Sequence, residues 1–202
     1  MKTRVVVGIS GASGAAIGLR IVEILDRLGA ETHLAVSRAA ERTLREEVGP
    51  DALSLLRARA SHWHDIDDVG ASIASGSFPT RGMIVAPCSM RTLAAIANCL
   101  ADNLLTRAAD VHLKERRPLV LLARETPLHL GHLRAMIAAT EAGAIIMPPV
   151  PAFYLKPASV AEIVDQIARR AIDMLRLFEP LAAQWQGGTA QSDDCETIQT
   201  SA

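Results

Sequence analysis

Short apolar runs alternate along the chain with longer stretches of helical period, and this alternation constrains the fold more than any other feature. The first run, residues 4–9, is rich in Val and ends at Ser10-Gly11, and the stretch after it places apolar residues on one helical face. The same order recurs to the end of the chain. We expect strands at residues 4–9, 32–36, 81–86, 119–123 and 144–147, and helices at 14–28, 37–44, 89–100, 129–142 and 160–177.

Strands that alternate with helices of this length form parallel pairs joined by right-handed crossovers. We therefore predict an α/β fold with one doubly wound parallel sheet flanked by helices. The length of 202 residues, half of them hydrophobic, suits one compact domain. We place this domain at residues 1–180 and expect a polar, flexible C-terminal tail at 181–202.

Charge and composition argue against several classes of partner. With 21 Lys and Arg against 22 Asp and Glu, the net charge of −1 gives no overall attraction to nucleic acid. No apolar run approaches the roughly 18–20 residues of a membrane span, and the first strand follows Met1 without a signal peptide. We expect a cytoplasmic protein without nucleic-acid or membrane partners.

Two histidine pairs have the spacing of metal ligands. His62 and His64 lie in a predicted loop without a third ligand nearby in sequence, and His129 and His132 begin a predicted helix. Three scattered cysteines suit neither a zinc site nor a disulfide framework. We expect none of these groups to bind a metal.

Small and hydroxyl-bearing residues collect at the carboxyl ends of the predicted strands, where parallel sheets bind ligands. The turn from Gly11 to Ser13 opens a helix, whose free N–H groups suit a phosphate or a flavin, although a plain tight turn is the alternative. The second strand ends in Ser37-Arg38, without the acid that holds the ribose of NAD. A mononucleotide is favoured, and NADP stays open through Arg38.

Two further segments follow strands. Ser89 and Thr92 repeat the pattern of hydroxyls at a helix start, although, taken alone, an ordinary serine cap beside a buried Cys88 is the better explanation. Arg124-Glu125 is either part of a site or a structural ion pair. Three other polar residues are dispersed and look individually like surface groups: Lys114, Tyr154 and Arg170.

Five segments in this order resemble the UbiX-type flavin prenyltransferase family. They are GISGASGA (8–15), IASGSF (73–78), APCSMRTLAAIA (86–97), LLTRAADVHLKERRPLVLLARETPLHLGHL (104–133) and MPPVPAFYLKP (147–157). The similarity covers residues 4–177. It implies a Rossmann-like flavoprotein fold and a homo-oligomer, typically a dodecamer, with active sites at subunit interfaces.

The resemblance also implies a reaction. Such enzymes join a dimethylallyl group from dimethylallyl monophosphate to N5 and C6 of reduced FMN, without a metal, and the prenylated FMN becomes the cofactor of UbiD-type decarboxylases. Two alternatives share the ability to bind FMN: a decarboxylase of the phosphopantothenoylcysteine type, and a passive flavin-binding subunit of an aromatic acid decarboxylase. The first is disfavoured because no suitable His follows the second strand.

The resemblance assigns roles to individual residues. Ser13 and Glu125 match catalytic positions. Tyr154 and Arg170 match contacts to the prenyl phosphate, and Lys114 matches a phosphate ligand that arrives from a neighbouring subunit. Val69 stands where some members have a Trp that lines the prenyl pocket. The positions that match FMN contacts are Gly11, Ala12, Ser13, Ser37, Ser89, Met90, Arg91, Thr92 and Arg124.

Overall fold

A computed structural model describes residues 2–185, and most of the predicted tail, residues 186–202, lies outside the described residues. Within residues 2–185 the strands form one parallel sheet in the order β3-β2-β1-β4-β5-β6. This is the strand order of Rossmann folds, in which the chain winds outward from a central strand in both directions. The predicted α/β class and doubly wound sheet are confirmed.

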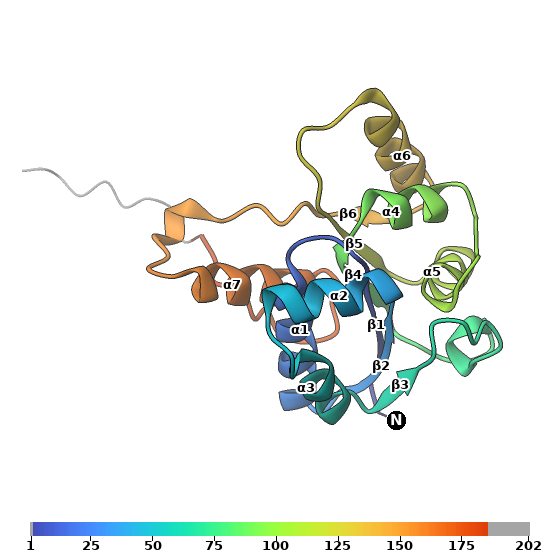
Figure 1. Cartoon of the computed structure of the whole chain (residues 1–202), viewed down its shortest axis with the longest axis horizontal. Helices are drawn as coiled ribbons and strands as arrows, with labels where there is room; N and C mark the ends of the chain where they lie inside the picture. Colours follow the sequence, from blue (N-terminus) through green and yellow to red (C-terminus); the bar gives the residue numbers. More distant parts are fainter. Residues whose placement is uncertain (1, 186–202) are drawn as a thin grey trace, which may run out of the picture.

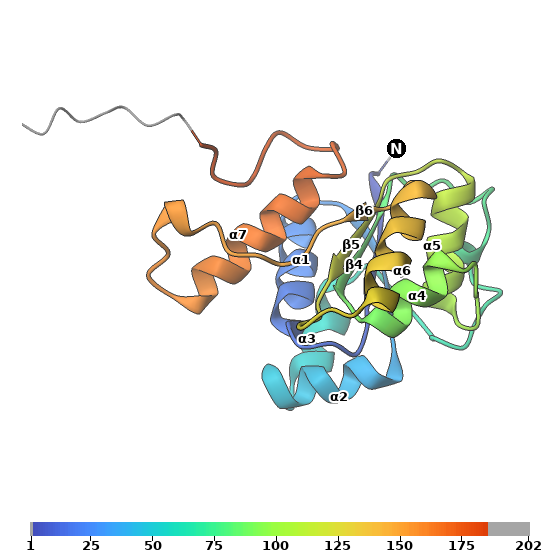
Figure 2. The same ribbon diagram turned by 90° about the horizontal axis from the view of Figure 1, so that it is seen from above.

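The helices cover both faces of the sheet (Figures 1 and 2). The strands are β1 (Arg4–Ile9), β2 (Glu31–Val36), β3 (His62–His64), β4 (Met83–Cys88), β5 (Leu119–Ala123) and β6 (Ile145–Ile146). The helices are α1 (Ala15–Arg27), α2 (Arg38–Glu47), α3 (Ala52–Arg59), α4 (Met90–Ala97), α5 (Leu104–Lys114), α6 (Leu130–Glu141) and α7 (Val160–Asp173). Two short 3-10 helices are η1 (Ser72–Ala74) and η2 (Phe153–Leu155).

Two hydrophobic cores lie on opposite faces of the sheet. One joins the strands to α1, α2, α3 and α7, and the other joins them to α4, α5 and α6. The four central strands are almost wholly buried, as expected for parallel strands covered on both faces. Gly18 of α1 allows the closest helix–strand approach, because a Cβ there would lie 2.3 Å from the carbonyl oxygen of Ala86.

Serine caps fix the start of the two helices that matter most for the site. The Ser37 hydroxyl accepts a hydrogen bond from the Ala40 N–H at 3.2 Å, and the Ser89 hydroxyl accepts one from the Thr92 N–H at 3.3 Å. Both caps were predicted from the sequence. Each places a hydroxyl group at the carboxyl end of its strand, β2 or β4.

The structure corrects several predicted boundaries. Strand β4 does not stop before Pro87 but runs through it to Cys88, and the pairing with β5 shifts there, so no ladder hydrogen bond is required of the proline. Helix α7 ends at Asp173, four residues earlier than predicted, and β6 pairs over two residues only. Among residues 2–185, no helix is long and apolar enough to cross a membrane.

Candidate active site

The Ser10 hydroxyl joins the carboxyl ends of β1 and β4. It donates to the Pro87 carbonyl at 2.9 Å and accepts from the Ser89 N–H at 2.7 Å. Ser10 is 1% exposed, so both bonds are shielded from water. The two loops that follow these strands are therefore held side by side, and each opens into a helix.

A cavity of about 450 Å³ lies above these strand ends. Its size is within the range of pockets that bind small molecules and cofactors. Two ion pairs contribute to its walls, Arg38 with Asp67 and Arg91 with Asp102. It brings together five of the nine predicted FMN contacts: Gly11, Ser37, Ser89, Arg91 and Thr92.

The close approach of the first loop to α2 requires a glycine. A Cβ on Gly11 would lie 2.4 Å from the Cβ of Ala39. Ala12 and Met90 are buried beside the cavity residues and do not line it. The two loops predicted from the sequence do border the cavity. Their residues that line it can contact a ligand, whereas the buried Ala12 and Met90 pack beneath the loops.

Glu47 reaches the N-terminus of α1 from the end of α2. Its carboxylate accepts hydrogen bonds from the N–H groups of Gly14 at 2.8 Å and Ala15 at 2.9 Å, and one from the Ser13 hydroxyl. Burial alone would raise the pKa of the Glu47 carboxyl, but these hydrogen bonds and the nearby charge of Arg124 lower it below its ordinary value. Glu47 is therefore an anion at neutral pH and holds Ser13 in place.

Sequence reasoning missed Glu47. Helix α1 carries no acidic residue in its first turn, and Glu47 lies 33 residues away from Gly14 along the chain. A helix without an acidic residue in its first turn is a weak indication that a carboxylate from another segment binds its N-terminus. Only the fold shows that Glu47 is this residue.

Arg124 follows β5, and its charge lies close enough to Glu47 to lower the pKa of that carboxyl. Its N–H donates to the Cys88 carbonyl at 3.0 Å, and its Nε is buried without a hydrogen-bond partner within residues 2–185. No ion pair among the described residues joins it to Glu125, which is exposed. A buried guanidinium nitrogen without a partner is costly unless an anion satisfies it. The residues present therefore fit a phosphate-bearing ligand such as FMN.

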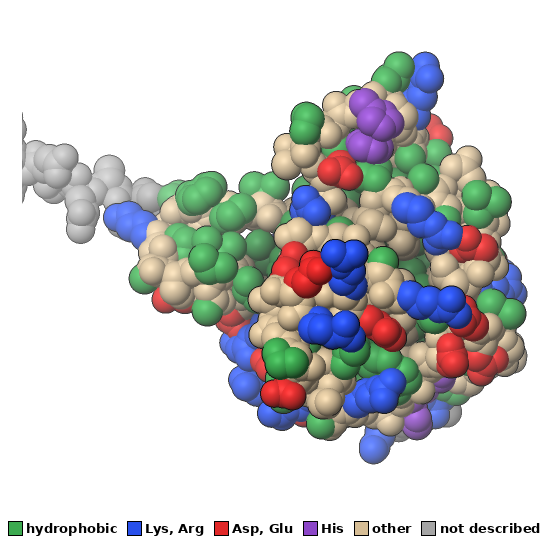
Figure 3. Space-filling model, in the orientation of Figure 1, with side chains coloured by type: hydrophobic (Ala, Val, Ile, Leu, Met, Phe, Trp, Pro, Cys, Tyr) green, Lys and Arg blue, Asp and Glu red, His purple; other side chains and the backbone are tan. Residues whose placement is uncertain are grey.

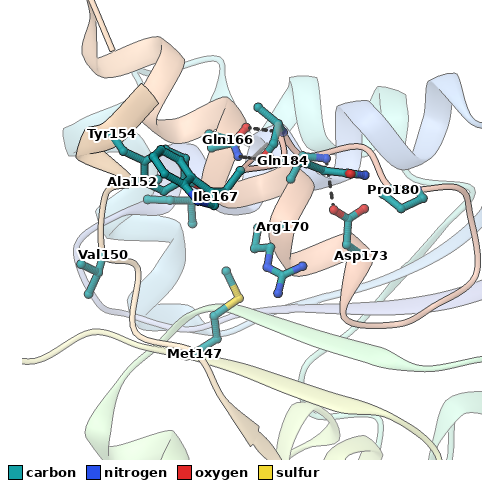
Figure 4. Close-up of a pocket in the computed structure, with 13 residues that line it drawn as sticks. Met147, Val150, Ala152, Tyr154, Gln166, Ile167, Arg170, Asp173, Pro180 and Gln184 are labelled. Carbon is teal, nitrogen blue, oxygen red and sulfur yellow. Dashed lines mark hydrogen bonds between the residues drawn. The ribbon is translucent and has the colours of Figure 1, made fainter. Parts of the chain in front are cut away.

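A second cavity, also of about 450 Å³, contains Tyr154 and Arg170 (Figure 4). Arg170 points into it from α7, opposite Met147 near the end of β6, and the Tyr154 ring meets Trp185 edge-on at 5.3 Å. Both predicted phosphate contacts thus share one pocket, and they come from segments that are well separated in sequence.

Residues 181–185 form one wall of this second cavity. The Asp173 carboxylate accepts from the N–H groups of Leu181 at 2.8 Å and Ala182 at 3.1 Å. Gln166 exchanges two hydrogen bonds with the backbone of Ala183, at 3.2 and 3.1 Å. The start of the predicted tail therefore packs along α7.

The family model described as Flavoprotein matches residues 1–176. "Flavin prenyltransferase UbiX" from Thauera aromatica is 55% identical over 184 residues, which cover 91% of this chain and 94% of that protein.

This chain belongs to the UbiX flavin prenyltransferase family. The predicted resemblance is thereby confirmed, and so is the flavoprotein assignment.

Solved structures of UbiX proteins have the same fold. The crystal structure of AnUbiX (PadA1) in complex with FMN and dimethylallyl pyrophosphate superposes with a TM-score of 0.89 at 48% identity, covering 93% of this chain and 100% of that one. A dodecameric FMN-dependent UbiX-like decarboxylase from Escherichia coli O157:H7 has a TM-score of 0.87 at 44% identity, covering 92% and 100%. The phosphopantothenoylcysteine-type and passive-subunit alternatives are not favoured.

Several of the residues that the UbiX resemblance singled out line neither cavity: Ala12, Ser13, Val69, Met90, Lys114, Arg124 and Glu125. Lys114 is exposed at the end of α5 and forms an ion pair with Glu115. Val69 is 51% exposed in the loop after β3. Within one chain, Lys114 does not join Tyr154 and Arg170.

Cys88 does not act as a nucleophile in this UbiX chain. Burial raises the pKa of its thiol far above the ordinary value, so the reactive thiolate is not populated. His129 is also accounted for, because its Nδ1 accepts from the Gly131 N–H at 3.0 Å and caps α6.

Proposed function

We propose that this protein transfers a dimethylallyl group from dimethylallyl monophosphate to reduced FMN and so makes prenylated FMN. Arg124 carries the proposal, because its buried Nε has no partner among residues 2–185 and its backbone is bonded to Cys88, next to the Ser89 hydroxyl of the first cavity. Family membership supports the same reaction. Reduced FMN supplies the electron-rich ring that is alkylated at N5 and C6.

The first cavity would hold FMN. The Ser37 and Ser89 hydroxyls accept helix-capping bonds, and lone pairs remain on both oxygens. The free N–H groups at the starts of α2 and α4 add donors and partial positive charge. Arg124 would bind the FMN phosphate. These contacts orient the flavin without a metal.

The second cavity would hold the phosphate of the prenyl donor. Phosphate leaves readily only if its developing charge is met. Arg170 and the Tyr154 hydroxyl already share this pocket, and we infer that Lys114 joins them from a neighbouring subunit. The exposure of all three side chains is consistent with a site that is completed by another chain.

Ser13, Glu47 and Glu125 would move the protons. Alkylation of the flavin requires that C6 lose a proton, and a carboxylate held close to the ring is a suitable acceptor. Glu125 is exposed, and among the described residues its carboxylate accepts only from the neighbouring Thr126 N–H, at 3.2 Å, so it is available to substrate. Ser13 donates to the ionised Glu47, and this pair can relay a second proton.

Exposed hydrophobic side chains on the surface support a homo-oligomer. Helix α6 exposes Leu130, Leu133 and Ile137, and the segment around η2 exposes Phe153 at 73%. Hydrophobic side chains gather on the projecting part of the molecule around η2 and the start of α7 (Figure 3). Large exposed apolar side chains that cluster in this way are typical of subunit contacts. A dodecamer, transfer of the product to a UbiD-type decarboxylase and a cytoplasmic location stay predictions.

Phosphate release tests the reaction. The protein is incubated anaerobically with dimethylallyl monophosphate and either reduced or oxidised FMN, and inorganic phosphate is measured. We expect release with reduced FMN only. A parallel incubation with dimethylallyl pyrophosphate identifies the preferred donor, because that donor would release pyrophosphate instead. Release that is independent of flavin redox state would contradict the proposal.

Two substitutions separate binding from chemistry. Arg124→Ala should weaken FMN binding about tenfold or more, since a hydrogen bond to a charged group contributes about 1.5–3 kcal/mol. Arg134→Ala removes an exposed arginine of α6 and serves as the control. Glu125→Gln should slow turnover and leave FMN affinity unchanged. Loss of FMN binding in Glu125→Gln would show that its role is wrongly assigned.

A further inference from the structure

Four side chains gather on one face of the sheet at its β2–β3 edge. Glu31 and His33 lie two residues apart on β2, and His62 and His64 lie two residues apart on β3, so each pair projects to one side. His33 and His62 are direct partners in the parallel register. The predicted loop at His62 and His64 is wrong, because these residues form strand β3, which brings them beside Glu31 and His33 of β2.

The spacing of three of these groups matches a tetrahedral metal site. Glu31 Oε1 lies 3.2 Å from His62 Nε2 and 3.4 Å from His33 Nε2, and the three possible ligand atoms all lie within 4.8 Å of one another. Zinc–ligand bonds of about 2.0–2.1 Å in tetrahedral geometry place ligand atoms roughly 3.3–3.4 Å apart. The two separations from Glu31, 3.2 and 3.4 Å, lie close to this value, and the two histidine nitrogens lie within 4.8 Å of each other.

His33 provides a second, independent observation. The residue is 2% exposed, and its Nε2 is buried without a hydrogen-bond partner within the described chain. Its Nδ1 lies 3.0 Å from His64 Nε2. In the tautomer in which Nδ1–H donates to His64, Nε2 carries a lone pair 3.4 Å from the Glu31 carboxylate. A metal-bound histidine is oriented in this way, with its other ring nitrogen donating to a neighbouring acceptor. The His33 and His62 rings are stacked with their centroids 4.5 Å apart, so the exposed His62 must turn to bring its own nitrogen to the same ion.

The electrostatic surroundings select among cations. Three imidazoles, those of His33, His62 and His64, lie around the single carboxylate of Glu31. Arg4 Nε donates to Glu31 Oε1 at 3.2 Å, which holds the carboxylate in place and also opposes a cation. Neutral imidazoles compensate for this repulsion only for ions that prefer nitrogen ligands.

We propose that Glu31, His33 and His62 form a binding site for a divalent transition-metal ion such as Zn²⁺, with His64 orienting His33. The site lies at the edge of the sheet near the N-terminus, whereas the FMN cavity lies at the carboxyl ends of the strands (Figure 1). His62 is half-exposed and offers a path of entry. The ion ties the short edge strand β3 to β2 and takes no part in prenyl transfer.

Calorimetric titration of untagged, chelator-treated full-length protein tests the site. We expect one Zn²⁺ per chain and a higher Tm in its presence, with no change of Tm in Mg²⁺. His62→Ala should reduce the affinity more than 100-fold. His64→Ala should reduce it about 10- to 100-fold, as for other residues that orient a metal ligand.

His129→Ala is the matched control, because it removes a histidine of the other closely spaced pair and should leave the affinity unchanged. Circular dichroism establishes that each variant is folded, and His62→Gln provides a second, milder removal of the ligand. Prenyl transfer by the chelated protein should equal that of the zinc-loaded protein. The site is refuted if no zinc binds, or if zinc binds with equal affinity to wild type and to both folded His62 variants.

Discussion

Substitution of Ser10 by Ala removes the one side chain that joins β1 to β4 beneath the flavin cavity. In the wild type, the Ser10 hydroxyl is the acceptor for the Ser89 N–H at 2.7 Å. The Pro87 carbonyl, which also bonds this hydroxyl, retains the Ser10 backbone N–H at 3.2 Å. The substitution therefore leaves the Ser89 N–H without a partner, whereas the Pro87 carbonyl keeps one.

The expected magnitude follows from that count. A shielded backbone group without a partner costs about 1–3 kcal/mol of unfolding free energy. For a domain of this size, each kcal/mol shifts Tm by roughly 2–4 °C, so we expect Ser10→Ala to lower Tm by about 2–12 °C. Because Ser89 also lines the cavity, FMN affinity should fall in the same variant.

Thermal unfolding at fixed protein concentration and FMN fluorescence titration measure the two effects. Thr140→Ala is the control, since the exposed Thr140 hydroxyl donates to the Met136 carbonyl at 2.8 Å on the surface of α6 and leaves no buried group without a partner when it is removed. It should change Tm little and FMN affinity not at all. A Tm of Ser10→Ala within 1 °C of wild type would refute the view that this hydroxyl ties the two strands together.

Three further outcomes are expected. Gly18→Ala should destabilise the protein by about 1–3 kcal/mol or more, because the new Cβ would lie 2.3 Å from the Ala86 carbonyl oxygen. Gly70→Ala is the control, since its Cβ would have no contact closer than 3.4 Å and should not destabilise the protein. The denaturant midpoints of the two variants measure the difference. Burial, reinforced by the charge of Arg117, lowers the pKa of His112 to about 4. The neutral imidazole therefore contributes its full share to the free energy of unfolding above pH 6.5, the pKa of histidine in the unfolded chain, and this share is lost as the pH falls towards 4. Unfolding at pH 7.5 and pH 5 should therefore differ by about 2 kcal/mol from this group alone, and a His112→Gln variant that keeps the full pH dependence would contradict the assignment. Glu47→Gln should retain FMN binding and slow prenyl transfer at all pH values, and unchanged single-turnover rates would exclude Glu47 from proton transfer.

The sequence predicted the centre of the fold better than its edges. Residues 4–9 and 119–123 are continuous apolar runs that only a buried strand explains, and the structure forms β1 and β5 there. The Ser37 and Ser89 caps were predicted equally well, because a serine at the start of a helix commonly accepts an N-cap hydrogen bond. Strand β3 was missed because its three residues contain two histidines and no apolar run.

The sequence predicted the site residues that lie directly at the ends of strands. It did not predict contacts between segments that are distant in sequence. Gly11, Ser37 and Ser89 lie directly at strand ends, so the parallel sheet brings them together. Glu47 and the partnership of His33 with His62 depend on how α2 and β3 return to the sheet, and no spacing in the sequence reveals either. The inferred approach of Lys114 from another subunit is likewise invisible within one chain.

The mass of the flavin after one anaerobic incubation tests the central claim most directly. The protein is mixed with reduced FMN and dimethylallyl monophosphate, the flavin is extracted, and its mass is measured, with Arg170→Ala as a variant that should bind FMN but react slowly. We predict a flavin heavier than FMN by one dimethylallyl unit. Recovery of unmodified FMN from wild-type protein that has bound both substrates would contradict the account.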